Sequence, residues 1–215
     1  MGVFDTLFRG RGKEDQRSAL EHPRDLQLGD IVKFGFVAQA DLSNSRFEVT
    51  AINTYDWRDG TDTVFILKGE RGNIVWVQVV EEDGDEHLAI SRKMTRAQVE
   101  TLFDPEAFAT VFEEGAGTEL DARAVPDGFE NWTAARYAEM EDCTPGYYHE
   151  GDYRARELPK YEDEATGLDY YLLIDDSEQF AIEIEVYTAG DTEVSATIYL
   201  EPNVIDELWP ANKRG

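Results

Sequence analysis

Short apolar runs with a period of two, separated by turns of glycine and acidic residues, constrain this chain most. Successive side chains of a strand point to opposite faces, so such runs predict half-buried β-strands, and the tight turns predict antiparallel neighbours. The sequence therefore predicts a mainly β (α+β) fold, made of an antiparallel β-barrel or of curled β-meander modules. The runs are residues 26–34, 47–52, 64–67, 74–80, 87–91, 170–174, 181–187 and 194–200.

The alternation is strictest in residues 181–187, where we expect Ile182, Ile184 and Val186 to point inward. A helical spacing of apolar residues replaces this alternation in only two short stretches. Residues 95–114 predict one or two short connecting helices, with Thr95 as a cap, a new start at Pro105 and an end at the following glycines. Residues 205–209 predict a helical turn that Pro210 stops.

An offset of 106 residues aligns two of these β segments. Leu67, Val80, Gly84 and Asp85 are identical to the residues 106 positions later. Two interpretations remain open: a duplicated β-module, or two hairpins that share a Gly-Asp turn.

We divide the chain into four segments. Residues 1–24 form an apolar stripe and a polar linker, and residues 25–94 form a β-meander or small barrel module. Residues 95–145 form a helical connector. Residues 146–215 form a second β-module, which either packs with the first as one body or stands apart.

The N-terminal stripe contains Phe4, Leu7 and Phe8, which would share one helix face with Val3. It lacks the apolar core of a secretory signal, so we expect a cytoplasmic protein. The stripe either packs on the protein or a partner, or makes at most weak contact with a membrane surface.

Charge excludes some partners. The 46 acidic and 20 basic residues give a net charge of −26, which argues against binding to nucleic acid or to anionic lipid. Residues 97–215 alone carry a net charge of −22. This acidity is either a solvated surface or a face that docks a basic partner. The single cysteine excludes an intramolecular disulfide.

Candidate chemistry is sparse. An acidic loop at residues 56–62 and a group around residue 149 contain metal-ligand types, but both are better explained as surface turns. There is no nucleophile elbow and no glycine-rich nucleotide loop. We therefore predict no catalytic residue, no metal and no cofactor. The residues considered are Asp56, Asp59, Asp62, Cys143, His149, Glu150 and Asp152.

An aromatic cluster follows the helical segment. Aromatic side chains with polar atoms favour interfaces and ligand grooves, and they also fill irregular parts of a core. Both interpretations are kept. The predicted ligand- or partner-binding residues are Trp132, Tyr137, Tyr147, Tyr148 and Tyr153, with Tyr161 in the same cluster.

Residues 26–91 resemble an uncharacterised bacterial domain family. The resemblance lies in a Leu-x-x-Gly-Asp-x-Val pattern, in a strand containing Trp76, and in the acidic residues that end it. The N-terminal stripe is similar to small proteins encoded near phage-shock and polyamine-type genes. The resemblance implies a cytoplasmic accessory protein and no assigned catalytic residue. The pattern residues are Leu26, Gly29, Asp30 and Val32, followed later by Glu81 and Glu82.

Three functions stay open, in this order. The first is a non-enzymatic accessory or adaptor protein that binds another protein through its acidic or aromatic surface. The second is a binding module for a cationic small ligand such as a polyamine, which would need carboxylates and aromatic rings in one cavity. The third is a carboxylate- or metal-dependent hydrolase, which would need one concave pocket holding two carboxyls of strongly shifted pKa.

Overall fold

Eleven strands form one antiparallel sheet in residues 20–82, 84–159 and 166–211, which the computed structural model describes. They are β1 (Ile31–Phe34), β2 (Arg46–Trp57), β3 (Gly60–Gly69), β4 (Ile74–Glu82), β5 (Asp85–Met94), β6 (Glu119–Asp121), β7 (Arg136–His149), β8 (Thr166–Ile174), β9 (Phe180–Tyr187), β10 (Thr192–Leu200) and β11 (Ile205–Trp209). Their order is β11-β1-β2-β3-β4-β5-β10-β9-β8-β7-β6. The mainly β fold class is therefore confirmed.

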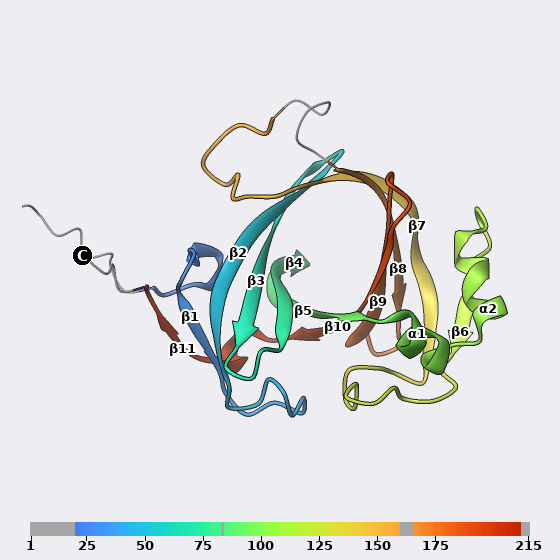
Figure 1. Cartoon of the computed structure of the whole chain (residues 1–215), viewed down its shortest axis with the longest axis horizontal. Helices are drawn as coiled ribbons and strands as arrows, with labels where there is room; N and C mark the ends of the chain where they lie inside the picture. Colours follow the sequence, from blue (N-terminus) through green and yellow to red (C-terminus); the bar gives the residue numbers. More distant parts are fainter. Residues whose placement is uncertain (1–19, 83, 160–165, 212–215) are drawn as a thin grey trace, which may run out of the picture.

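The sheet closes on itself. Late β2 pairs with late β7, from Thr54 opposite His149 to Trp57 opposite Gly146. This seam joins eight strands, β2–β5 and β7–β10, into the ring visible in Figure 1. Strands β1 and β11 extend the sheet beyond β2, and β6 extends it beyond β7. Because of this closure, the paired parts of β2 and β7 present no free strand edge.

Two four-stranded meanders make up the ring. β2–β5 and β7–β10 meet at the β5/β10 pair and again at the seam, both antiparallel. Strands β8, β9 and β10 begin 106, 106 and 107 residues after β3, β4 and β5. This spacing agrees with the offset expected from a duplicated module. The β segments of residues 25–94 and 146–215 share one sheet.

Two short helices, α1 (Arg96–Leu102) and α2 (Pro105–Ala109), connect the meanders and lie outside the ring (Figure 1). Thr95 caps α1 in a capping box with Gln98, and Pro105 starts α2, as predicted. Just after α2, the Phe112 ring packs edge-on against Tyr171 of β8 at 5.4 Å. No helix in the described part of the chain has the length and apolar character needed to cross a bilayer.

The main hydrophobic core lies between one face of the ring and the segments that cover it. Ile182 and Ile184 of β9 are fully buried in this core together with Phe103 and Trp132 from the connecting segment. The predicted burial of these isoleucines is confirmed, but they face the covering segments. Glu183 and Glu185, on the opposite face of β9, point into the ring.

Truncation of Ile184 to alanine is expected to lower the free energy of unfolding by about 2–4 kcal/mol, because it leaves a cavity in a dry, packed core. Chemical denaturation measures this loss. Ile74→Ala is the matched control, since Ile74 is 41% exposed, and should cost less than about 1 kcal/mol. Equal losses would contradict the burial of Ile184 in the main core.

The Gly-Asp pair before β1 has a structural role. Gly29 adopts a φ of +83°, which favours glycine, and Asp30 is fully buried. The Asp30 carboxylate accepts hydrogen bonds from the backbone N–H groups of Gln27 and Ala211, each at 2.8 Å. Asp30 therefore ties the start of β1 to the end of β11.

Three sequence-based expectations are wrong. Residues 205–209 form the strand β11, paired with β1, in place of a helical turn. The loop expected at residues 56–62 is a hairpin, because β2 runs to Trp57 and β3 starts at Gly60. The segment boundary at residue 145 cuts through β7. Register shifts in β7 on either side of Glu141 interrupt its alternation and hide the strand from a periodicity search.

Candidate functional site

A cavity of about 350 Å³ occupies the inside of the ring. All eight ring strands contribute side chains to it, which is possible only for a cavity that faces the ring axis. It is lined by Tyr55, Trp57, Asp62, Gln78, Val80, Ala89, Glu141, Thr144, Tyr170, Glu183, Glu185 and Tyr199. We call this cavity the lumen.

Glu185 is held by two tyrosines. The Tyr55 hydroxyl, from β2 on the far side of the seam, donates to the Glu185 carboxylate at 2.5 Å, and the Tyr187 hydroxyl donates to its other oxygen. Burial raises the pKa of Glu185, while these two hydrogen bonds oppose the rise. The carboxylate is therefore fixed in position before any ligand arrives.

Glu183 stands two residues away on the same face of β9. The Ser91 hydroxyl lies 3.2 Å from its carboxylate, and Thr197 donates to Ser91 at 2.8 Å. Burial, together with the charge of the neighbouring Glu185, raises the pKa of Glu183 to about 7. Glu183 can therefore exchange its proton near neutral pH.

Aromatic rings form the wall beside the carboxylates. The Trp57 indole stacks on Tyr55 with ring centroids 5.4 Å apart, and it lies 5.5 Å from the Tyr170 ring. The indole N–H of Trp57 donates to Asp62 at 2.7 Å. Such ring faces attract cations through their quadrupole.

The lumen is strongly negative. Four carboxylates, from Asp62, Glu141, Glu183 and Glu185, are among its lining residues, and no Lys or Arg is. The positive charge of Lys93 acts on the lumen from nearby, because it lowers the pKa of Glu185. Lys93 already pairs with Glu193 and lies over the Trp76 ring at 4.8 Å. Lys93 is not among the residues that line the lumen.

The predicted aromatic residues do not form one site. Trp132 and Tyr137 are buried in the main core, as the core-filling interpretation expects. Tyr147 is 38% exposed, and Tyr153 packs against His149. Only Tyr148 approaches the lumen, where its ring lies 5.1 Å from Tyr55. Tyr161 and the N-terminal stripe lie outside the described residues.

The structure also separates the predicted metal-ligand types. Asp62 faces the lumen, whereas Asp56 is buried on the opposite face, 3.9 Å from His149. Cys143 is exposed and His149 is fully buried. Among the described residues, no three His, Cys, Asp or Glu side chains are grouped to hold a metal ion.

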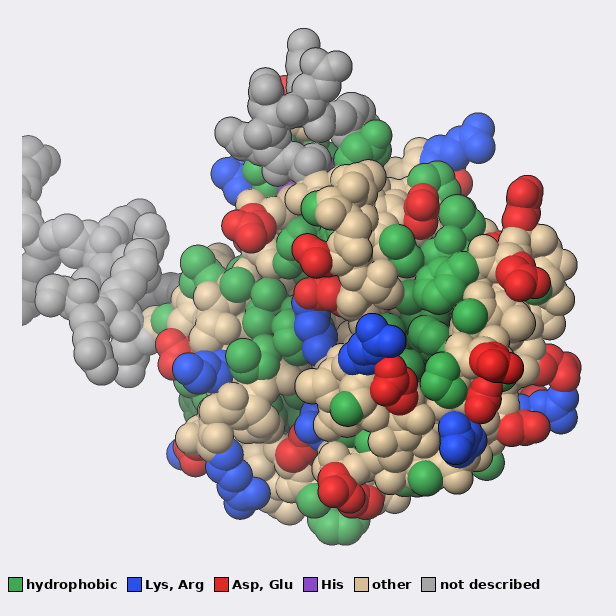
Figure 2. Space-filling model, turned by 45° about the vertical axis from the view of Figure 1, so that its right-hand side comes forward, with side chains coloured by type: hydrophobic (Ala, Val, Ile, Leu, Met, Phe, Trp, Pro, Cys, Tyr) green, Lys and Arg blue, Asp and Glu red, His purple; other side chains and the backbone are tan. Residues whose placement is uncertain are grey.

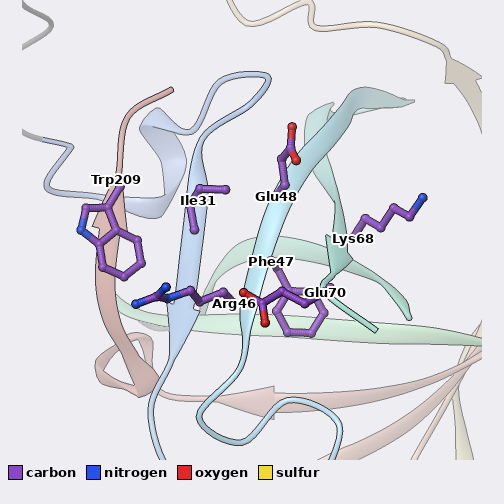
Figure 3. Close-up of a pocket in the computed structure, with 8 residues that line it drawn as sticks. Ile31, Arg46, Phe47, Glu48, Lys68, Glu70 and Trp209 are labelled. Carbon is purple, nitrogen blue, oxygen red and sulfur yellow. The ribbon is translucent and has the colours of Figure 1, made fainter. Parts of the chain in front are cut away.

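A second hollow lies outside the ring, between β11, β1, β2 and β3. Figure 3 shows Arg46 on β2 reaching past Ile31 toward Trp209, and the guanidinium lies 5.2 Å from the Trp209 ring centre. Two basic and two acidic side chains line this hollow, so it has no net preference for either charge. The lumen is therefore the stronger candidate site.

Sequence reasoning named polyamine-type ligands, but of the lumen residues it considered only Asp62 as a candidate, and only as a metal-ligand type. Glu183 and Glu185 were visible only as the polar positions of the alternating run in residues 181–187. No protein-family model, no curated protein and no solved structure matches the chain, so the case for function rests on this geometry.

Proposed function

We propose that the protein is a binding module for a small organic cation, such as a polyamine, held in the lumen. One observation carries the proposal: Glu183 and Glu185 stand beside Tyr and Trp rings in a cavity whose lining contains no basic residue. A cavity of this size is at the lower end of the range for small-molecule sites.

The chemistry of the lumen suits an ammonium group. A cation that leaves water must recover its hydration energy from charged and π partners. Ion pairs with Glu183 and Glu185 supply most of that energy, and the faces of Trp57 and Tyr170 supply more through cation–π contact. Tyr55 and Tyr187 hold Glu185 in place, so little ordering is required when the ligand binds.

Binding should also release a proton. A cation favours the ionised form of Glu183, whose pKa of about 7 leaves it partly protonated near neutral pH. The ligand therefore lowers this pKa, and the proton leaves as the ammonium arrives.

Calorimetric titration of the full chain with spermidine at pH 7 and moderate salt tests the proposal. We expect saturable binding at one site, with a heat that changes with the ionisation enthalpy of the buffer. The control is Glu48→Gln, a substitution of an exposed residue that does not line the lumen, which should bind like wild type. Absence of heat at high protein concentration would refute the proposal.

A hydrolase is the second candidate, because the lumen holds two carboxyls of raised pKa in one concave pocket. Glycosidases place their two carboxyls on opposite sides of the scissile bond. Glu183 and Glu185 instead stand side by side on β9. Binding is therefore the better account, and turnover of aryl glycosides that depends on Glu183 would reverse this order.

The adaptor role stays a prediction. On the face shown in Figure 2, acidic side chains stand among Lys, Arg and hydrophobic surface and do not form one continuous acidic patch. Two of the five aromatic residues expected to contact a partner are buried in the core. The lumen offers a more specific chemistry than this surface does.

A further inference from the structure

A larger hollow of about 780 Å³ adjoins the lumen and opens at one end of the ring. The two share Val80 of β4 and Tyr199 of β10, so they lie next to each other. The apolar part of its lining includes Met140 on β7 and Leu172 and Ile174 on β8, and most of the other lining side chains are polar or charged. We call this hollow the mouth.

Carboxylates surround the mouth. Glu81 faces Arg24 at 3.7 Å and Glu201 faces His87 at 3.9 Å. Glu82 and Glu178 also line the mouth, and neither makes an ion pair with any residue that the structure describes. The outer end of the site therefore keeps two carboxylates, Glu82 and Glu178, without a cationic partner among the described residues.

Strand β4 gives the distance from the lumen to the outer end of the mouth. Gln78 lines the lumen and Glu82 lines the mouth, both on the same face of β4, and Val80 between them lines both. Four residues of strand span about 13 Å. A ligand that reaches from the lumen to the rim therefore spans about this length and passes the apolar side chain of Val80.

We infer that the site takes linear amines with two or more ammonium groups, one in the lumen and one at the mouth, joined by an aliphatic chain. The methylene groups lie against Val80 and Leu172, where a charge would be poorly solvated. The outer ammonium pairs with Glu82 and Glu178. This inference rests on the proposed function and specifies the class of ligand.

Linear diamines of increasing length, each titrated beside the monoamine with the same number of carbons, test the inference. Short diamines should bind no better than their monoamines, because the second charge falls beside Val80 and Leu172, short of the rim carboxylates. Diamines long enough to reach the rim should bind about three- to tenfold tighter than the matched monoamine. High salt should shrink this advantage, because the rim is exposed.

The double variant Glu82→Gln and Glu178→Gln should abolish the advantage of long diamines and leave monoamine binding unchanged. Diamines that match their monoamines at every length, with no effect of the rim variant, would overturn the two-point site and leave the proposed function standing. If no amine binds, the proposed function fails and this inference fails with it.

Discussion

Replacement of Glu183 by glutamine is expected to weaken spermidine binding about a hundredfold. The amide keeps the shape of the side chain and its contact with Ser91, but it removes one of the two charges beside the aromatic wall. Loss of one partner from a buried charge pair costs about 3 kcal/mol, which is about a hundredfold in Kd. Calorimetry of the variant and of Glu48→Gln gives the comparison, and equal affinities would exclude Glu183 from the site.

The pH dependence of binding should change with the same substitution. Wild-type affinity should fall as the pH drops below about 7, because the protonated form of Glu183 offers no charge. One required deprotonation gives up to about a tenfold loss per pH unit. Glu183→Gln should flatten this affinity profile between about pH 5 and about pH 7, because the variant lacks the carboxyl group that titrates there. An unchanged profile would assign the proton to another residue.

The free energy of unfolding of Glu183→Gln provides a control that does not depend on the ligand. The pKa of Glu183 is about 7 in the folded protein, above its ordinary value of 4.5. The folded state therefore binds this proton more tightly, and its contribution to stability is full below pH 4.5 and is lost as the pH rises through 7. Glutamine does not ionise, so the variant should be more stable than wild type at high pH. Denaturation curves on both sides of neutrality would show that lost binding is not lost folding.

The periodicity of the sequence predicts the strands well because each ring strand has one face in a dry core. Buried residues alternate with a period of two within each strand for this reason, as in the pairs Phe65 and Leu67, Ile182 and Ile184, and Ala196 and Ile198. The helices follow equally local rules, since Thr95 and Pro105 act through the backbone next to them. Register shifts defeat the method in β7, where Cys143 has a φ of +48° and Pro145 suggests a turn.

The lumen is a product of ring closure, and this explains why sequence reasoning missed it. Alternation shows that a strand has two faces, but it does not say which face will be enclosed. Glu183 and Glu185 look like solvated positions of an amphipathic strand until the β2–β7 seam brings Tyr55 across to them. Three of the four lumen carboxylates lie in the acidic residues 97–215, but net charge alone could not select them from the other acidic side chains.

Replacement of Gly146 by alanine is expected to disturb the seam and to lower both the free energy of unfolding and the affinity for the ligand. A Cβ atom at this position would lie 2.3 Å from the Trp57 ring, well inside contact distance. Trp57 has little freedom to move, because it stacks on Tyr55 and donates to Asp62. Overpacking of this kind costs about 1–3 kcal/mol. Displacement of the indole would also remove one aromatic wall of the lumen.

Gly60→Ala is the matched control, because Gly60 lies opposite Trp57 in the β2/β3 hairpin and nothing is within 4 Å of its Cβ position. It should leave the unfolding free energy and spermidine affinity close to wild type. Gly146→Ala should lower both, because the same four residue pairs that close the ring also place Tyr55 and Trp57 in the lumen. If Gly146→Ala lost stability and kept full affinity, the lumen would not depend on a closed seam, and the ligand would have to bind elsewhere.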